Sequence, residues 1–283
     1  FFARDNNTLV LRPDMTPAVA RCVAKYFMDD DMPLRLCYLE RTFKNNSSYQ
    51  GRLKERAEMG AELIGDDSAD GDAEMIAMVI DSLKAAGLKE FQVELGQVAF
   101  YRSLLEEAGF CGEVEEELNQ LVENKNDFGV AELLKGQDID EGLKQAFLKL
   151  PELFGSLEQI AQARKLTSAP RALAAIERLE QVHAILKSYG LADYVSFDLG
   201  MLSKYHYYTG IIFKAYTYGT GDYIVTGGRY DKLLVQFGKD TPAVGFAIVV
   251  DQVMAALSRQ QIDTPVTLVN TVILYEATAR DNA

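Results

Sequence analysis

The chain has 283 residues, of which 48% are hydrophobic and 25% charged, an ordinary balance for a globular protein with a buried core. Its formal net charge of −13 disfavours a protein that mainly grips phosphate backbones, because that affinity comes from clustered lysine and arginine. No apolar run approaches the roughly 20 residues that a membrane-spanning helix needs. No basic stretch followed by an apolar one begins the printed sequence, so we expect no secretory signal. The 3 cysteines lack metal-ligand or paired spacing, so we expect no metal site, no disulfide framework and a cytoplasmic location.

The first hundred residues alternate between strand and helix patterns. β-Branched and aliphatic runs favour strands, and a polar, glycine-bearing stretch between two such runs predicts a hairpin. Thr16 has the side chain of a helix N-cap, and Pro17 suits a first helical position. The expected elements are a strand over 8–12, a helix starting at 17 after its N-cap, hairpin strands over 34–43 and 59–64, a helix over 73–86 ended by Gly87, and a strand over 91–95.

The character of the chain changes at about residue 100. From there to residue 189 the segments are highly charged and helically periodic, with few β-branched residues, so we expect a mainly helical insertion. Strand patterns then return. The expected elements are strands over 195–199, 208–216, 223–226 and 243–247, a turn at Gly227-Gly228, a helix near 232–237 and a last helix through 257.

Strands far apart in the sequence, separated by a helical block, predict an α+β fold with an antiparallel sheet flanked by helices. Both ends of the sequence look cut, so we expect a fragment. The expected organisation is a core over 1–99 and 190–260, a helical insertion over 100–189, and the start of an incomplete C-terminal unit over 261–283.

Two polar clusters in the N-terminal half have groups that suit a charged ligand. Asp14 follows a strand end and can hold an ammonium group, although a solvated aspartate in a capping loop is the alternative. Lys44 and Arg52 belong to a set of flexible cations on the hairpin, which suits phosphate or carboxylate ligands. A loop that only increases solubility is the alternative interpretation.

Two further clusters lie in the C-terminal half. The tyrosines around His206 can line a pocket that stacks on a planar ring, but tyrosines are also common in half-buried strands. His206 has no second histidine nearby, so we expect it to have no metal or catalytic role. Gly227-Gly228 allows a ligand to approach the backbone, and Arg229 can pair with Asp231 or present its charge; a simple turn is the alternative.

Taken in order, these clusters resemble the motifs of the histidyl-tRNA synthetase family, which has a class II aminoacyl-tRNA synthetase fold. The resemblance covers nearly the whole chain, and its GGRYD stretch is specific. The family's LRPEGT, motif-2 hairpin, RGLDYY, GGRYD and motif-3 segments match residues 11–16, 35–65, 203–208, 227–231 and 245–253. This resemblance implies a class II synthetase-like antiparallel sheet.

This sequence differs from that family at residues that serve amino-acid activation. The motif-2 arginine that binds the ATP phosphate falls on Lys44, the RGLDYY arginine on Ser203, and the motif-3 arginine on Gln252. Losing one such electrostatic contact typically lowers the rate by about 10²–10³. The resemblance therefore implies negligible amino-acid activation.

The positions that match belong to the part of the family's pocket that recognises histidine. This combination is similar to that of the synthetase-like regulatory subunits of ATP phosphoribosyltransferase. The resemblance implies a non-catalytic subunit without a cofactor, which forms a homodimer within a hetero-oligomer. It also implies that this subunit assembles with the short-form catalytic subunit, which acts in the first step of histidine biosynthesis, and that it responds to histidine. The implied histidine-binding residues are Asp14, Thr16, Glu58, Glu62, Tyr208, Gly227, Gly228 and Tyr230, and the candidate anion contacts are Lys44, Arg52 and Arg229.

Two alternatives remain open on the sequence. One is a working histidyl-tRNA synthetase, and the other is a synthetase-like paralogue that binds a different amino acid or a protein target. The sequence also leaves open whether histidine binds in the synthetase-like pocket or at a subunit interface.

Overall fold

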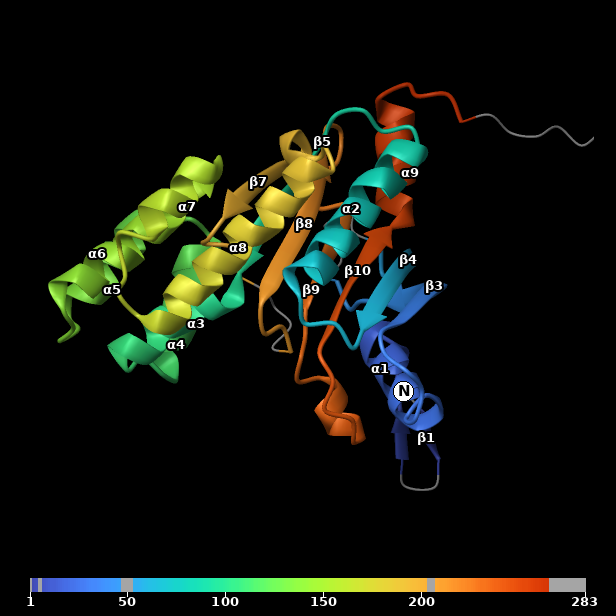
Figure 1. The fold of residues 1–283 in the computed structure, drawn as a ribbon, viewed down its shortest axis with the longest axis horizontal. Coiled ribbons are helices and arrows are strands. Elements are labelled where there is room, and N and C mark those ends of the chain that lie inside the picture. The colour runs from blue at the N-terminus through green and yellow to red at the C-terminus, as the bar shows by residue number, and fades with distance from the viewer. Residues whose placement is uncertain (1, 5–6, 47–52, 203–206, 265–283) are drawn as a thin grey trace, which may run out of the picture.

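The computed structural model describes residues 2–4, 7–46, 53–202 and 207–264. Its main feature is an 8-stranded sheet with the strand order β3-β4-β10-β9-β8-β5-β7-β6 (Figure 1). A separate small sheet pairs β1 (Phe2–Arg4) with β2 (Asn7–Leu9). The strands of the main sheet are β3 (Leu34–Phe43), β4 (Glu55–Ile64), β5 (Phe91–Gln97), β6 (Phe154–Gly155), β7 (Val195–Asp198), β8 (Ile211–Thr217), β9 (Val225–Arg229) and β10 (Ala243–Val249).

The expected α+β class is confirmed, but the sheet is mixed rather than wholly antiparallel. Its one parallel pair among the described strands is β5 with β7, in which Val93 lies opposite Val195. The whole helical segment lies between these two strands in the sequence, and a helical crossover of this kind brings the chain back in the same direction.

Two helices cover one face of the sheet. α2 (Ala69–Ala85) packs against β4, β9 and β10, and α8 (Pro170–Ser188) packs against β5 and α2 (Figure 1). Side chains of one strand parity, such as Leu63, Val93 and Phe213, join these helices in the main apolar core. Because successive side chains alternate between the two faces of a sheet, the intervening residues of these strands face the side away from α2 and α8.

The sequence of α2 explains where this helix begins and which face it buries. The hydroxyl of Ser68, the N-cap, accepts a hydrogen bond from the Gly71 amide at 3.1 Å. Asp70 and Asp72 lie in the first turn, where a negative charge interacts favourably with the helix dipole. The buried side chains include Ile76, Val79, Ile80 and Leu83, at the three- and four-residue spacing of a helix face.

The segment between β5 and β7 is mainly helical, as the sequence predicts. α8 is also packed against α3, so that the last helix of the segment lies between the others and α2. Within the described residues, no helix is both long and apolar enough to cross a membrane. The helices that precede α8 are α3 (Val98–Ala108), α4 (Glu113–Glu123), α5 (Asp127–Lys135), α6 (Glu141–Lys149) and α7 (Leu157–Ala163).

The prediction that Thr16 caps a helix is wrong. α1 spans Thr16–Tyr26, its N-cap is Met15, and no side chain caps it. The Thr16 hydroxyl donates instead to the Glu62 carboxylate, at 2.9 Å across 46 residues of sequence. A tertiary contact has therefore replaced the local one.

The predicted turn at Gly227-Gly228 is also wrong, because both glycines lie inside β9. Gly227 is opposite Phe246 and Gly228 opposite Gly245 in the ladder with β10. At the other predicted elements the differences are small. The strand expected over 8–12 is β2 and ends at Leu9, the helix near 232–237 is a short 3₁₀ turn over Leu234–Phe237, and the last helix is α9 (Val250–Arg259).

Candidate functional site

A pocket lies on the face of the sheet opposite α2. It is formed by the loop before α1, the β3–β4 hairpin, the segment before β8, and strands β9 and β10. Its empty space of about 350 Å³ includes open solvent, and the centre of a water molecule fits in only about 20 Å³ of it, so a ligand requires the lining side chains to move. Its lining residues are Asp14, Thr16, Lys44, Glu58, Tyr207, Tyr208, Thr226, Tyr230, Gly245, Phe246 and Ala247.

Glycines make room for the functional groups at the floor of this pocket. A Cβ atom at Gly245 would lie 1.6 Å from Oε2 of Glu62, so the Glu62 carboxylate occupies the place of a side chain. A Cβ at Gly228 would lie 2.8 Å from the Tyr208 ring, and one at Gly227 would lie 2.4 Å from the Phe213 ring on the other face. The double glycine therefore serves close packing across the sheet.

Glu62 is the central polar group of the site, with 1% of its surface exposed. The hydroxyl of Tyr230 donates a hydrogen bond to Oε2 of Glu62 at 2.5 Å, and the hydroxyl of Thr16 donates one to Oε1 at 2.9 Å. Burial raises the pKa of Glu62 to about 8, against the opposite influence of these two hydrogen bonds. A carboxyl group that holds its proton near neutral pH can both donate and accept a hydrogen bond.

Asp14 is held in a fixed position at the entrance to α1. Its Oδ1 accepts the backbone amide of Thr16 at 3.1 Å, and its Oδ2 accepts the hydroxyl of Tyr207 at 2.7 Å. The ring of Tyr207 also lies against Tyr208, with their centroids 4.8 Å apart. Asp14 is thus tied both to its own loop and to the segment before β8, rather than being a solvated loop residue.

The polar lining of the pocket suits a ligand with a cationic group. Asp14 and Glu58 contribute two carboxyl groups to the lining, Glu62 is buried beneath it, and Lys44 is the cation among the described lining residues. Burial raises the pKa of Glu58, although the nearby charge of Lys44 acts in the opposite direction. An arriving ammonium or imidazolium group would stabilise the ionised form of these carboxyl groups.

Arg229, a candidate anion contact, lies apart from this pocket. Its guanidinium donates to Oδ1 of Asp72 at 2.8 Å and to Asp231 at 3.0 Å, which realises the predicted pairing of Arg229 with Asp231. Arg178 of α8 donates to the other oxygen of Asp72 at 2.7 Å. Burial raises the pKa of Asp72 in spite of both arginines. This ion network joins α2, α8 and β9. The other candidates Arg52, Ser203 and His206 lie outside the described residues.

Sequence reasoning missed three residues that contribute to the site or support it. Tyr207, whose hydroxyl donates to Asp14, is one of several tyrosines in its segment, and Asp72 belongs to no motif. The Tyr38 ring lies over Gly60, and its hydroxyl is buried without a hydrogen-bond partner in the part of the chain that the structure describes. Burial, together with Glu62 and Asp14, raises the pKa of Tyr38. The alternation of β3 was the available signal, since Tyr38 is opposite Gly60 in the ladder.

Comparisons with known proteins identify relatives of this chain over most or all of its length. The sequence profile of the histidyl-tRNA synthetase family matches residues 2–253. An ATP phosphoribosyltransferase regulatory subunit from Acetivibrio thermocellus is 41% identical over 283 residues, which cover 100% of this chain and 68% of that protein. The chain belongs to the family of ATP phosphoribosyltransferase regulatory subunits. The same description applies to a protein from Ruminiclostridium cellulolyticum, 42% identical over 100% of this chain and 68% of its own length.

Solved structures place this family within the synthetase fold. A crystal structure from Bacillus halodurans, described as an ATP phosphoribosyltransferase regulatory subunit/histidyl-tRNA synthetase, has a TM-score of 0.80 and 37% identity, and the match covers 88% of this chain and 65% of that one. An ATP phosphoribosyltransferase complex from Thermotoga maritima is similar in fold, with a TM-score of 0.66 at 21% identity, over 88% of this chain and 84% of that one. The chain spans about two thirds of the length of the curated relatives.

Proposed function

We propose that this protein is the non-catalytic regulatory subunit of an ATP phosphoribosyltransferase, that its pocket binds histidine, and that it has no synthetase activity. The observation that carries the proposal is the combination of a carboxylate-lined pocket with family membership at 41% identity over the whole chain. The partner is the short-form catalytic subunit, which acts in the first step of histidine biosynthesis.

The chemistry of histidine fits the polar groups of the pocket. Its α-ammonium group needs a fixed carboxylate, which Asp14 supplies because both of its oxygens are already oriented. Its imidazole ring needs hydrogen-bonding groups beside an aromatic surface, and Glu62 with Tyr230 and Tyr208 supplies these. Lys44 is the candidate partner for the histidine carboxylate.

The groups that would stabilise a developing phosphate are replaced. Lys44, Gln252 and Ser203 stand at the positions that the synthetase resemblance assigns to three arginines, and neither glutamine nor serine carries a charge. Each such loss lowers the rate by about 10²–10³, and combined losses are not additive. The protein is therefore expected to bind histidine without activating it.

Regulation requires that histidine prefer one arrangement of the complex over another. A ligand that binds both arrangements equally would shift nothing, however tightly it bound. Typical couplings between two sites are about 1–3 kcal/mol, which correspond to changes in affinity of roughly 5- to 150-fold. We expect the coupling between histidine and the catalytic subunit to lie in this range.

We also expect the protein to form a homodimer within the complex. The end of β2 and the two residues after it expose large apolar side chains that the described chain leaves uncovered: Leu9 is 56%, Val10 61% and Leu11 68% exposed. Leu39, on the edge strand β3, is 68% exposed. A second copy that covers this surface would remove these side chains from water.

Two measurements test the proposed pocket chemistry. Isothermal titration calorimetry should detect histidine binding, and the Asp14→Ala variant should bind it at least tenfold more weakly because the ammonium loses its charged partner. A pyrophosphate-exchange assay with histidine and ATP should give no signal above background. Robust exchange would establish a synthetase instead, and unchanged binding by Asp14→Ala would place the histidine site elsewhere.

A further inference from the structure

A pair of polar side chains outside the pocket joins the two segments that carry its tyrosines. Tyr207 and Tyr208 precede β8, and Tyr230 follows β9. The ladder between β8 and β9 stops short of these residues. Thr209 and Asp231 lie beside the tyrosines in the two segments, and they are not among the residues that line the pocket.

The side chain of Thr209 continues the strand pairing past the end of the ladder. Its backbone amide donates to the carbonyl oxygen of Arg229 at 2.8 Å, as in a regular ladder. Its hydroxyl oxygen then accepts the backbone amide of Asp231 at 3.0 Å, and the same hydroxyl donates to Oδ2 of Asp231 at 3.1 Å. Thr209 and Asp231 are thus joined in both directions, and the hydroxyl satisfies a backbone donor that the ladder does not reach.

Asp231 links this pair to a third segment. Its Oδ1 accepts from the guanidinium of Arg229 at 3.0 Å and from the backbone amide of Ala243, the first residue of β10, at 3.3 Å. The carbonyl oxygen of Ala243 accepts in turn the backbone amide of Tyr230 at 2.7 Å. Because both of its oxygens accept hydrogen bonds, the Asp231 carboxylate is held in one orientation, and the hydroxyl of Thr209 is held with it.

The three tyrosines that these segments carry meet as one aromatic wall. The ring centroid of Tyr207 is 4.8 Å from that of Tyr208 and 5.9 Å from that of Tyr230. The hydroxyl of Tyr207 donates to Asp14, and that of Tyr230 donates to Glu62. The spacing of the two segments therefore sets the positions of both carboxyl contacts at once, and these contacts receive opposite ends of the proposed ligand.

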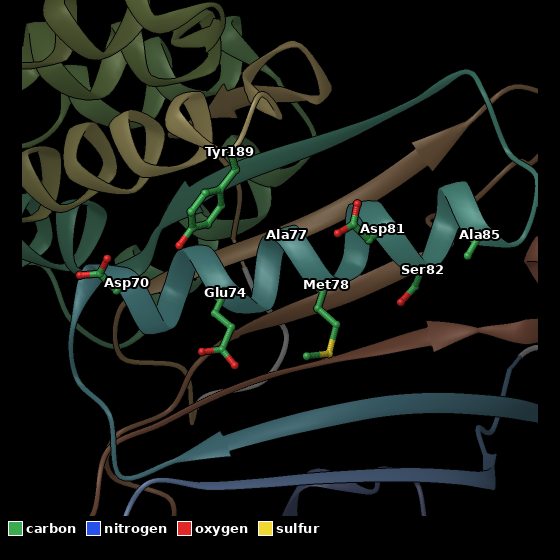
Figure 2. A pocket seen from close by; sticks show the side chains of 8 residues that line it. All are labelled: Asp70, Glu74, Ala77, Met78, Asp81, Ser82, Ala85 and Tyr189. Atoms are coloured by element: carbon green, nitrogen blue, oxygen red, sulfur yellow. The ribbon is translucent and has the colours of Figure 1, made fainter.

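A tyrosine on the surface shows a different situation. Figure 2 shows Tyr189 beside the shallow hollow along α2, where it is 53% exposed. An exposed side chain of this kind changes rotamer rapidly and independently of its neighbours. Tyr208 and Tyr230 are 6% and 1% exposed and pack within a buried cluster, so their alignment depends on the backbone segments that carry them.

We infer that Thr209 is a positioning residue of the histidine pocket, and that its paired hydrogen bonds with Asp231 hold the tyrosine wall in the arrangement that receives histidine. The inference rests on the proposed function, because that function supplies the ligand. A pocket whose side chains move to admit a ligand binds it tightly only if the groups that receive it keep their positions. Thr209 determines histidine affinity in this way without touching the ligand.

The test is histidine binding, measured by isothermal titration calorimetry on the whole protein with substitutions at Thr209. Thr209→Val removes the hydroxyl at nearly constant shape, and Thr209→Ser keeps it. The matched control is Thr217→Val at the other end of β8, where the Thr217 hydroxyl donates to the carbonyl oxygen of Glu90 at 2.5 Å and accepts from Gln260 at 2.9 Å. The control loses the same two kinds of hydrogen bond away from the pocket. Urea titrations give the stability of each variant.

Thr209→Val should bind histidine at least about fivefold more weakly, the factor that corresponds to one lost internal hydrogen bond. Thr209→Ser and Thr217→Val should stay within about twofold of wild type, even where Thr217→Val loses as much stability as Thr209→Val. The chain has 14 tyrosines and no tryptophan, so near-ultraviolet circular dichroism reports mainly on tyrosine packing. This signal should change more in Thr209→Val than in Thr217→Val.

Wild-type histidine affinity in Thr209→Val would overturn the inference while the proposed function stands. An equal loss of affinity in both valine variants would also overturn it, because affinity would then follow stability alone. If Thr209→Val does not fold, Asp231→Asn takes its place with the same expected result, since it replaces one acceptor oxygen of the pair by a donor. If the wild type does not bind histidine, the proposed pocket and the inference both fail.

Discussion

Replacing Gly245 by alanine would test the packing of the pocket floor with the smallest possible side chain. The new Cβ would lie 1.6 Å from Oε2 and 2.6 Å from Cδ of Glu62, and 2.8 Å from the carbonyl oxygen of Ala61. The carboxylate must move by more than 1 Å to restore ordinary contact. Since Tyr230 and Thr16 donate to its two oxygens at 2.5 and 2.9 Å, that movement breaks at least one of these hydrogen bonds.

The expected loss of stability follows from these contacts. Forcing a methyl group into a packed site costs about 1–3 kcal/mol, and a lost internal hydrogen bond adds about 1 kcal/mol. Gly245→Ala should therefore lower the free energy of unfolding by about 2–4 kcal/mol in urea titrations, and it should abolish histidine binding at concentrations that saturate the wild type. The control is Gly221→Ala, because a Cβ at Gly221 meets nothing within 4 Å. Wild-type stability and histidine affinity in Gly245→Ala would refute the described position of Glu62.

Four further results are expected. In the assembled complex, Asp14→Ala should raise the histidine concentration that gives half-maximal inhibition at least tenfold, while gel filtration shows normal assembly. Unchanged inhibition would place the histidine sensor elsewhere. The raised pKa of Glu62 means that the folded state binds a proton more tightly than the unfolded state. The stability that this proton contributes is fully present below the unfolded pKa of about 4.5 and is lost as pH rises through about 8. Glu62→Gln should therefore gain more than about 1 kcal/mol relative to wild type between pH 5 and pH 8, and a difference independent of pH would contradict the described burial of Glu62. Asp72→Ala leaves the buried Arg229 without its main partner and should lower the unfolding free energy by about 3–5 kcal/mol in urea, whereas a loss below 1 kcal/mol would contradict the ion network. Tyr38→Phe removes a buried hydroxyl that has no partner among the described residues, so its unfolding free energy should stay within about 0.5 kcal/mol of wild type or rise, and a loss above 1.5 kcal/mol would reveal a hydrogen bond at this position.

The parts of the fold that the sequence predicted well are those with strong local patterns. The hairpin of β3 and β4, the helix α2, the helical segment after β5 and the strand β10 all follow from periodicity and from glycine or polar residues at their ends. The parallel pairing of β5 with β7 has no such local signal. It depends on how the helical segment between them returns the chain to the sheet.

The errors in the site have one physical cause, which is that a tertiary contact used a residue whose local chemistry suggested something else. Thr16 has the side chain of an N-cap, but its hydroxyl reaches Glu62. Gly227-Gly228 has the composition of a turn, but the two glycines are needed because Phe213 and Tyr208 pack against them inside the sheet. The pairing of Arg229 with Asp72 joins two segments far apart in the chain, so no spacing rule could have revealed it.

The most direct test of the proposed regulatory role is the activity of the matching short catalytic subunit, measured with and without this protein across a histidine titration. We predict strong activation by this protein, and inhibition by histidine that appears only in the mixture. An activity that does not respond to the protein, at any concentration of histidine, would contradict the regulatory role.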